Sequence, residues 1–217
     1  MSATLVLANK GYSSWSFRPF ILMRHFAIPF DEIVIDLGEA QTRANILKYS
    51  PSARCPALID GDLVIWDSLA TIEYLAETYP DIPIWPRERA ARALARSLAA
   101  EMHSGFQALR AHLPMNMRRA VKRRELTPEA AADVARIEAA WSDARQRFGA
   151  GGDFLFGGFS AADAMFAPVV NRLHIYDVPV GTATRTYMET VMALPAYRDW
   201  QEGAAAETWR IAKYEEI

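Results

Sequence analysis

The stretch from Ser52 to Tyr79 constrains the fold of this 217-residue chain more than any other. Two short apolar runs, residues 57–59 and 63–65, flank the dipeptide Asp60-Gly61. An Asp-Gly pair in this position predicts a tight β-hairpin, because both turn residues tolerate a positive φ. Beyond the second run the apolar residues recur at helical spacing, so we expect an amphipathic helix to begin near Asp67-Ser68.

A proline stands at the entrance of the hairpin. Pro56 directly precedes the first apolar run, where a proline is either an edge residue or part of a cis peptide bond. We expect a cis bond between Cys55 and Pro56, which would turn the chain and expose the backbone groups of Cys55 for binding.

The residues before the hairpin complete a small α/β unit. Residues 4–8 form a continuous apolar run, which predicts a strand buried on both faces. A helix follows in which Pro19 is expected within the first turn, and this helix must stop before Pro29. Residues 33–37 predict a second strand, parallel to the first, and residues 42–49 a short helix. The expected order is therefore β-α-β-α-β-β-α.

The remainder of the chain predicts helices alone. After a linker at residues 82–87, the alanine-rich run from Glu88 to Leu113 predicts one long helix. Gly105 is the one residue in this run that disfavours a helix. Further helices are expected from Thr127 to Gly149, from Ser160 onward, and over 184–192 and 196–205. Strands first and helices afterwards predict two segregated domains, residues 1–81 and 88–217.

Composition narrows the classes of function. The formal net charge is −2 and 51% of residues are hydrophobic, which is typical of a globular protein without a general affinity for nucleic acid. No apolar run reaches the length of a bilayer span, so no membrane partner is expected. The single cysteine precludes an intramolecular disulfide and fits a cytoplasmic location.

The order and spacing of these signals resemble the glutathione transferase family, of the bacterial, serine-type, zeta/theta-like kind. The resemblance rests on Pro56-Ala57-Leu58 before a hairpin, on Asp67-Ser68 opening a helix, and on the stretch Phe156–Asp163 with its Ser-x-x-Asp capping box. It implies an α/β thioredoxin-like N-terminal domain followed by an all-α helical C-terminal domain. It also implies a homodimer that uses glutathione as cosubstrate and adds its thiolate to a small hydrophobic electrophile.

The serines at residues 13–16 are the candidate catalytic groups. They occupy the position where thioredoxins carry Cys-x-x-Cys, and without a second cysteine dithiol exchange is unavailable. A hydroxyl at a helix N-terminus can instead stabilise a bound thiolate. The zeta-class motif aligns the catalytic hydroxyl with Ser13 and a supporting one with Ser14, while Trp15 replaces the cysteine of that class. The alternative is that these serines only cap the first helix.

The resemblance also implies which residues hold glutathione. Asp67 would accept the γ-glutamyl amino group, and the Ser68 hydroxyl would hold the neighbouring carboxylate. Cys55, ahead of Pro56, would pair through its backbone with the cysteinyl part. Arg54 and Arg43 are the candidates for the glycyl carboxylate, although a solvated surface charge is the commoner role for such an arginine.

The resemblance implies that Met102, His103 and Phe106, on one face of the expected fourth helix, line the electrophile pocket. Methionine and aromatic residues at this spacing are equally typical of a hydrophobic core. His103 has no partner at metal-ligand spacing, so no metal is expected. The basic run at residues 118–124 is interpreted as a solvated surface.

The sequence therefore predicts a glutathione transferase. One alternative is a glutathione-dependent isomerase (maleylacetoacetate isomerase-like) or peroxidase on the same scaffold, and the Trp15 replacement counts against the isomerase. Another is a non-catalytic, glutathione-transferase-like protein-binding module, which would have no need of Ser13, Pro56 and Asp67-Ser68.

Overall fold

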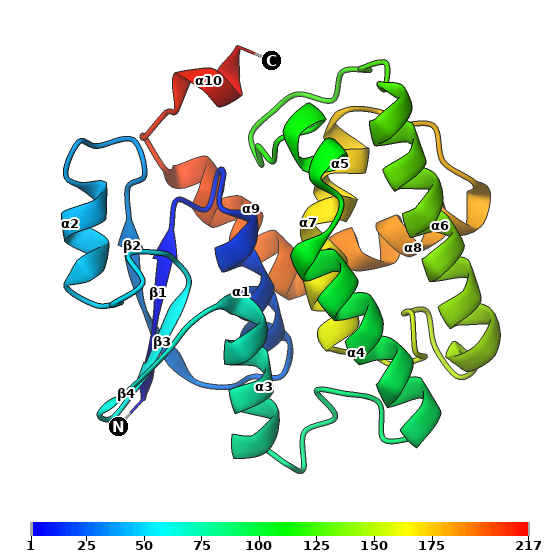
Figure 1. Ribbon diagram of the computed structural model, residues 1–217, viewed down its shortest axis with the longest axis horizontal. Coiled ribbons are helices and arrows are strands. Elements are labelled where there is room, and N and C mark those ends of the chain that lie inside the picture. The colour runs from blue at the N-terminus through cyan, green and yellow to red at the C-terminus, as the bar shows by residue number, and fades with distance from the viewer. Residues whose placement is uncertain (1, 217) are drawn as a thin grey trace.

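A computed structural model describes residues 2–216, beginning with a small mixed sheet and its helices (Figure 1). The elements follow the expected order: β1 (Ala3–Ala8), α1 (Ser14–His25), β2 (Phe30–Ile35), α2 (Thr42–Leu47), β3 (Ala57–Asp60), β4 (Leu63–Ile65) and α3 (Ser68–Thr78). The strand order in the sheet is β2-β1-β3-β4. β1 is parallel to β2 and antiparallel to β3, and β3 and β4 form the antiparallel hairpin.

The hairpin and its proline agree with the sequence-based expectation. Gly61 adopts a positive φ of 57° at the turn, where a side chain would be strained. The peptide bond between Cys55 and Pro56 is cis, as is the bond between Trp66 and Asp67, which no sequence signal indicated.

In the rest of the described chain the regular elements are helices, apart from two isolated β-bridges within residues 154–158. The helices are α4 (Arg89–Ser104), α5 (Gln107–His112), α6 (Pro128–Phe148), α7 (Ala161–Ile175), α8 (Thr182–Ala193), α9 (Pro195–Ala206) and α10 (Ala212–Glu215). Thr127 caps α6 through its side chain, and Ser160 and Asp163 form the expected capping box of α7. None of the helices between residues 2 and 216 has the length and apolar character that a bilayer crossing requires.

The prediction of one helix from Glu88 to Leu113 was wrong. The helix stops at Ser104, and Phe106 adopts a left-handed conformation with a φ of 58° before α5 begins. The Arg110 side chain binds carbonyl groups at the break: its Nε donates to Gly105 O at 3.0 Å and its Nη2 donates to Met102 O. The break therefore fixes the Arg110 guanidinium beside the end of α4.

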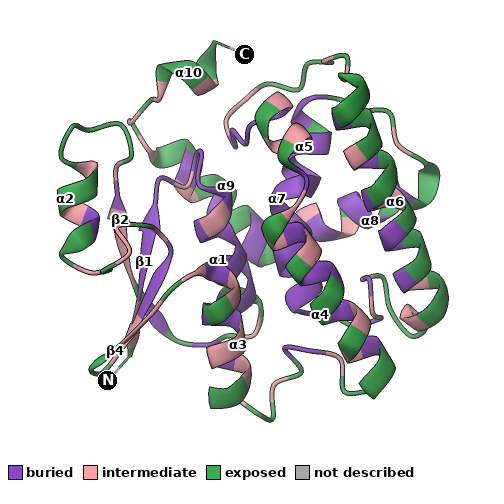
Figure 2. Ribbon diagram, viewed as in Figure 1, coloured by how far each residue is buried: buried purple, intermediate pink, exposed green. Residues whose placement is uncertain are grey.

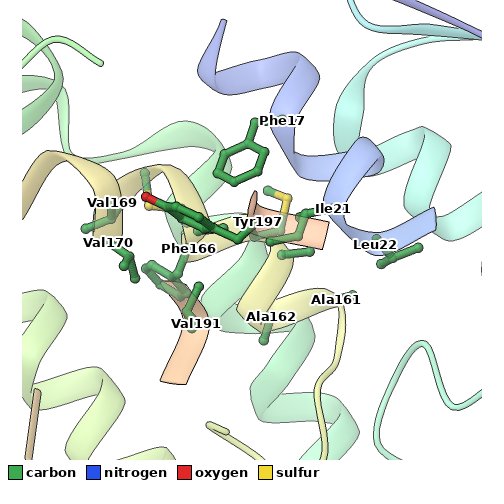
Figure 3. Close-up of a cluster of buried hydrophobic side chains, with 14 of the residues drawn as sticks. Phe17, Ile21, Leu22, Ala161, Ala162, Phe166, Val169, Val170, Val191 and Tyr197 are labelled. Atoms are coloured by element: carbon green, nitrogen blue, oxygen red, sulfur yellow. The ribbon is translucent and has the colours of Figure 1, made fainter. Parts of the chain in front are cut away.

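α7 forms the centre of the molecule and is the most uniformly buried helix (Figure 2). It packs against α1 and α4, while α1 also packs against α9. Apolar side chains of α1 such as Phe17 and Ile21 lie among those of α7 and α9 (Figure 3). On the other face of the sheet, Val6 and Ala57 pack against α2. This arrangement brings the N-terminus of α1 close to the last turn of α7, where Arg172 lies.

Candidate active site

A cavity of about 570 Å³ lies where the carboxyl end of β1 and the start of α1 meet the helical region. Residues 12–15, residues 53–56 and the Trp66-Asp67 pair line it from the α/β side. His103, Arg110 and Arg172, together with Pro114, Met115 and Tyr214, line it from the helical side. The cavity therefore gathers most of the site residues expected from the sequence.

Ser13 is the N-cap of α1 and its hydroxyl is engaged within that helix. Its Oγ accepts a hydrogen bond from the backbone N–H of Ser16 at 3.3 Å and donates to the Ser16 Oγ at 2.9 Å. The Ser16 Oγ in turn accepts from the backbone N–H of Ala8 at 3.0 Å. Ser13 therefore caps α1, as the alternative interpretation expected. Its side chain also lines the cavity.

Ser14, the first residue of α1, is oriented differently. Its Oγ accepts a long hydrogen bond, 3.5 Å, from Nη2 of Arg172, and within residues 2–216 the hydroxyl donates to no partner. Arg172 lies on α7 and donates from its Nε to Leu113 O at 2.8 Å. Sequence reasoning missed Arg172; the available signal was a lone arginine in a helix that is otherwise almost entirely apolar.

Two arginines lie over the ring of Trp15, which forms part of the cavity wall, and a third, Arg172, lines the same cavity. The guanidinium carbons of Arg18 and Arg110 lie 4.2 Å and 4.9 Å from the Trp15 ring centroid. Burial lowers the pKa of each guanidinium, that of Arg172 to about 9, and the neighbouring charge of Arg110 lowers the pKa of Arg18 and Arg172 further. The site is therefore strongly electropositive beside Ser14.

Asp67 and Ser68 begin α3 as expected. The Asp67 Oδ1 accepts from the N–H groups of Leu69 and Ala70, at 2.9 and 3.3 Å. Its Oδ2 lies 2.5 Å from Nε2 of His103. Burial raises the pKa of the Asp67 carboxyl, but these N–H bonds and the His103 contact outweigh that effect and the net pKa is lowered.

Ser68, also expected in the site, is completely buried and does not line the cavity, and its hydroxyl contacts a second arginine. Nη1 of Arg18 donates to the Ser68 Oγ at 3.4 Å, and Arg18 itself is completely buried. Each of the two serine hydroxyls, that of Ser14 and that of Ser68, is therefore backed by a buried guanidinium.

The residues around the cis proline lie at the cavity wall. Arg54, Cys55 and Pro56 all line it. Burial raises the pKa of the Cys55 thiol to about 12, so this side chain is not a thiolate at neutral pH. Cys55 therefore faces the cavity without the chemistry of a redox cysteine. Arg43 lies exposed on α2.

Two residues expected in the electrophile pocket lie elsewhere. Met102 is completely buried in the hydrophobic core and Phe106 is 8% exposed; neither lines this cavity, whereas His103 does. Adjacent residues of a helix point about 100° apart, so Met102 and His103 face different surroundings. The break after Ser104 also removes Phe106 from the helical spacing on which the expectation depended.

Comparison with known sequences identifies two matching regions. Residues 12–78 match the family model described as glutathione S-transferase, N-terminal domain, and residues 125–204 match that described as glutathione S-transferase, C-terminal domain. Glutathione S-transferase Z2 of Arabidopsis thaliana is 28% identical over 207 residues, 91% of this chain and 90% of that protein. A probable maleylacetoacetate isomerase of Caenorhabditis elegans is 34% identical over 104 residues, which span 48% of this chain and 49% of that protein.

Solved structures show the same fold. A glutathione transferase homologue from Burkholderia with bound glutathione superposes with a TM-score of 0.71 at 24% identity, covering 95% of this chain and 100% of that one. Human glutathione S-transferase T1-1 in its apo form gives a TM-score of 0.67 at 22% identity, and the match covers 97% of this chain and 93% of that one. The thioredoxin-like domain and the helical domain expected from the sequence are both present.

Proposed function

The chain belongs to the glutathione S-transferase family, and we propose that it is a serine-type transferase that ionises glutathione and adds the thiolate to a small electrophile. The observation that carries the serine-type mechanism is the contact between Arg172 and Ser14. The guanidinium takes a lone pair of the Ser14 hydroxyl, whose hydrogen is then free to point into the cavity toward a thiolate.

A hydroxyl hydrogen bond and a helix N-terminus together supply enough free energy to ionise the thiol of glutathione at neutral pH. Lowering a free thiol pKa of about 8.5 by two units requires about 2.7 kcal/mol of differential stabilisation. A hydrogen bond to a charged group contributes about 1.5–3 kcal/mol, and a helix N-terminus adds about 0.3–1 kcal/mol. We therefore assign the thiolate to Ser14, reversing the order expected from the sequence motif, because Ser13 is engaged with Ser16.

The other expected site residues suit glutathione itself; Cys55, Arg54 and Asp67 line the cavity, and Ser68 lies buried behind Asp67. We propose that the backbone of Cys55 pairs with the cysteinyl part and that Asp67 and Ser68 receive the γ-glutamyl end, with Arg54 near the glycyl carboxylate. Relatives with bound glutathione support this cosubstrate. A homodimer in the cytoplasm is part of the same proposal, and a monomeric mass by light scattering at micromolar concentration would contradict the dimer.

A calorimetric titration with glutathione, combined with ultraviolet absorbance of the bound thiolate, tests this function. Binding with a thiolate signal at neutral pH is expected. If glutathione does not bind, the chain is instead a non-catalytic protein-binding module on this scaffold.

A glutathione-dependent isomerase is the second candidate, because curated relatives from Caenorhabditis elegans, Vibrio cholerae and Dictyostelium discoideum carry the name maleylacetoacetate isomerase. The two reactions differ in stoichiometry. Transfer consumes one thiol for each product molecule, whereas isomerisation regenerates the thiol. Titrating the free thiol during turnover therefore distinguishes them, and a constant thiol concentration would favour the isomerase.

A further inference from the structure

A second cavity, of about 450 Å³, lies in the helical part of the molecule. Its walls come from the segment after α5, the last turns of α7, the end of α8 and the first turns of α9. Within residues 2–216 it shares no lining residue with the active-site cavity. Its volume falls in the usual range for small-molecule sites, roughly 300–1,000 Å³. The cavity is therefore large enough for a ligand of its own.

Asn171 of α7 brings an unpaired acceptor to this cavity. The residue is 3% exposed, and its Oδ1 is buried with no hydrogen-bond partner in the described part of the chain. Its Nδ2 donates to the Tyr197 hydroxyl at 3.4 Å, which is a long hydrogen bond. A buried acceptor without a donor is unfavourable, and such groups in folded proteins are normally paired with protein or with a bound molecule. Asn171 thus presents an acceptor that a ligand can satisfy.

Tyr197 of α9 places a donor beside that acceptor. Its ring lies among side chains of α1 and α7, with its centroid 5.4 Å from that of Phe17 (Figure 3). The hydroxyl oxygen accepts from Asn171, and the hydroxyl hydrogen is donated to no partner between residues 2 and 216. Burial raises the pKa of the Tyr197 phenol to about 12, so it keeps its proton at neutral pH. Because Oδ1 and Nδ2 of Asn171 share one carbon, the free acceptor and the hydroxyl donor lie side by side.

The remaining walls favour an uncharged ligand with an apolar body. Met117, Ile175 and Met192 line the cavity, and methionine side chains adapt their shape to what they contact. No aspartate or glutamate of the described residues lines it, so nothing there favours a cation. The Arg119 guanidinium, which also lines the cavity, lies 4.7 Å from the ring centroid of Tyr176.

We propose that this cavity is a second binding site, for a small uncharged ring compound that carries an N–H group next to a carbonyl, as lactams and cyclic imides do. The ligand N–H donates to Oδ1 of Asn171, and the ligand carbonyl accepts from the Tyr197 hydroxyl. Its flat apolar body lies against the methionines and Ile175. This inference goes beyond the proposed glutathione chemistry and does not depend on it, since the two cavities have separate walls.

Two ring compounds of nearly identical shape test the site. 2-Quinolone and coumarin have the same bicyclic outline and the same carbonyl, but coumarin has a ring oxygen where 2-quinolone has N–H. Ligand-detected NMR titration of the wild-type protein gives a Kd for each. We expect 2-quinolone to bind at least roughly 10-fold more tightly, about 1.4 kcal/mol, because coumarin leaves Oδ1 of Asn171 unpaired and sets a second acceptor against it. Equal affinities, tighter binding of coumarin, or a Kd for 2-quinolone above about 1 mM would overturn the proposal.

Variants at the two polar residues locate the binding. Asn171→Leu keeps the approximate size of the side chain and removes the acceptor, so the two compounds should bind within about 2-fold of each other. Tyr197→Phe should weaken both compounds several-fold and leave their ratio unchanged, because each loses the same donor to its carbonyl. Asn45→Leu, on α2 and lining neither cavity, should leave both affinities as in the wild type.

Circular dichroism establishes that each variant is folded before its titration. A preference for 2-quinolone retained in folded Asn171→Leu would place the binding elsewhere and reject the site. If Asn171→Leu does not fold, Tyr197→Phe decides the question, and unchanged affinities for both compounds would reject it.

Discussion

Nε2 of His103 lies 2.5 Å from Oδ2 of Asp67, a contact between the helical region and the start of α3. The other carboxylate oxygen of Asp67 accepts from the first free N–H groups of α3. One carboxylate therefore begins the helix, holds it against α4, and lines the cavity at the same time. The capping and the binding interpretations of Asp67 are compatible, because the two oxygens serve different partners.

Asp67→Asn should weaken glutathione binding by roughly 10–100-fold, because the γ-glutamyl amine loses a charged acceptor worth about 1.5–3 kcal/mol. Asparagine caps helices about as well as aspartate, so the free energy of unfolding should change by less than about 1 kcal/mol. Calorimetry and urea denaturation measure the two effects. Asp62→Asn, on the exposed hairpin turn, is the control. Unchanged glutathione affinity would remove Asp67 from the binding site.

Ser14→Ala should raise the pKa of bound glutathione by roughly one to two units, because the thiolate loses a hydroxyl donor. Ultraviolet titration of the complex measures this pKa, and raising the pH should restore part of the rate. Ser13→Ala should instead reduce the free energy of unfolding by about 0.5–2 kcal/mol through loss of the α1 cap. If only Ser13→Ala shifts the thiol pKa, the motif-based assignment to Ser13 is correct.

Arg118→Met should release the C-terminal segment. The Arg118 guanidinium donates to the carbonyls of Ala204, Glu207 and Trp209 and to the Tyr12 hydroxyl. Losing these bonds should favour local opening by at least roughly 10-fold, since each hydrogen bond from a charged group contributes about 1.5–3 kcal/mol. Trypsin cleavage after Arg210 reports the opening, and Arg123→Met is the exposed control. Equal cleavage rates in both variants would contradict this role.

Asp163 should make stability depend on pH between about 4 and 6. Burial raises the pKa of its carboxyl to about 6 in the folded chain, whereas the unfolded value is about 3.9. The folded state thus binds the proton more tightly, and its stabilising effect, up to about 3 kcal/mol, is lost as pH rises through this window. Urea denaturation of wild type and Asp163→Asn at several pH values measures the difference. Parallel pH profiles would show that the folded pKa is not raised.

The sequence alone predicted the elements whose cause is local. The hairpin follows from Asp60-Gly61, the start of α3 from Asp67, and the capping box of α7 from Ser160 and Asp163. In each case the deciding interactions join residues within a few positions of one another. The cis bond before Pro56 belongs to the same group, because proline acts on the bond that precedes it.

The partners inside the cavity depended on the tertiary structure. Ser14 and Arg172 are 158 residues apart and meet only because α1 packs against α7. The interruption at Phe106 ended the helical spacing that placed Met102, His103 and Phe106 on one pocket wall, and it also positioned Arg110 over Trp15. The sequence thus determined where the strands and helices begin and end, because turns and caps depend on residues close together in the chain. Through these ends it also determined which residues lie at the start of α1 and of α3. Which hydroxyl is free and where the positive charge accumulates were decided by helix packing, which joins residues that no local pattern relates.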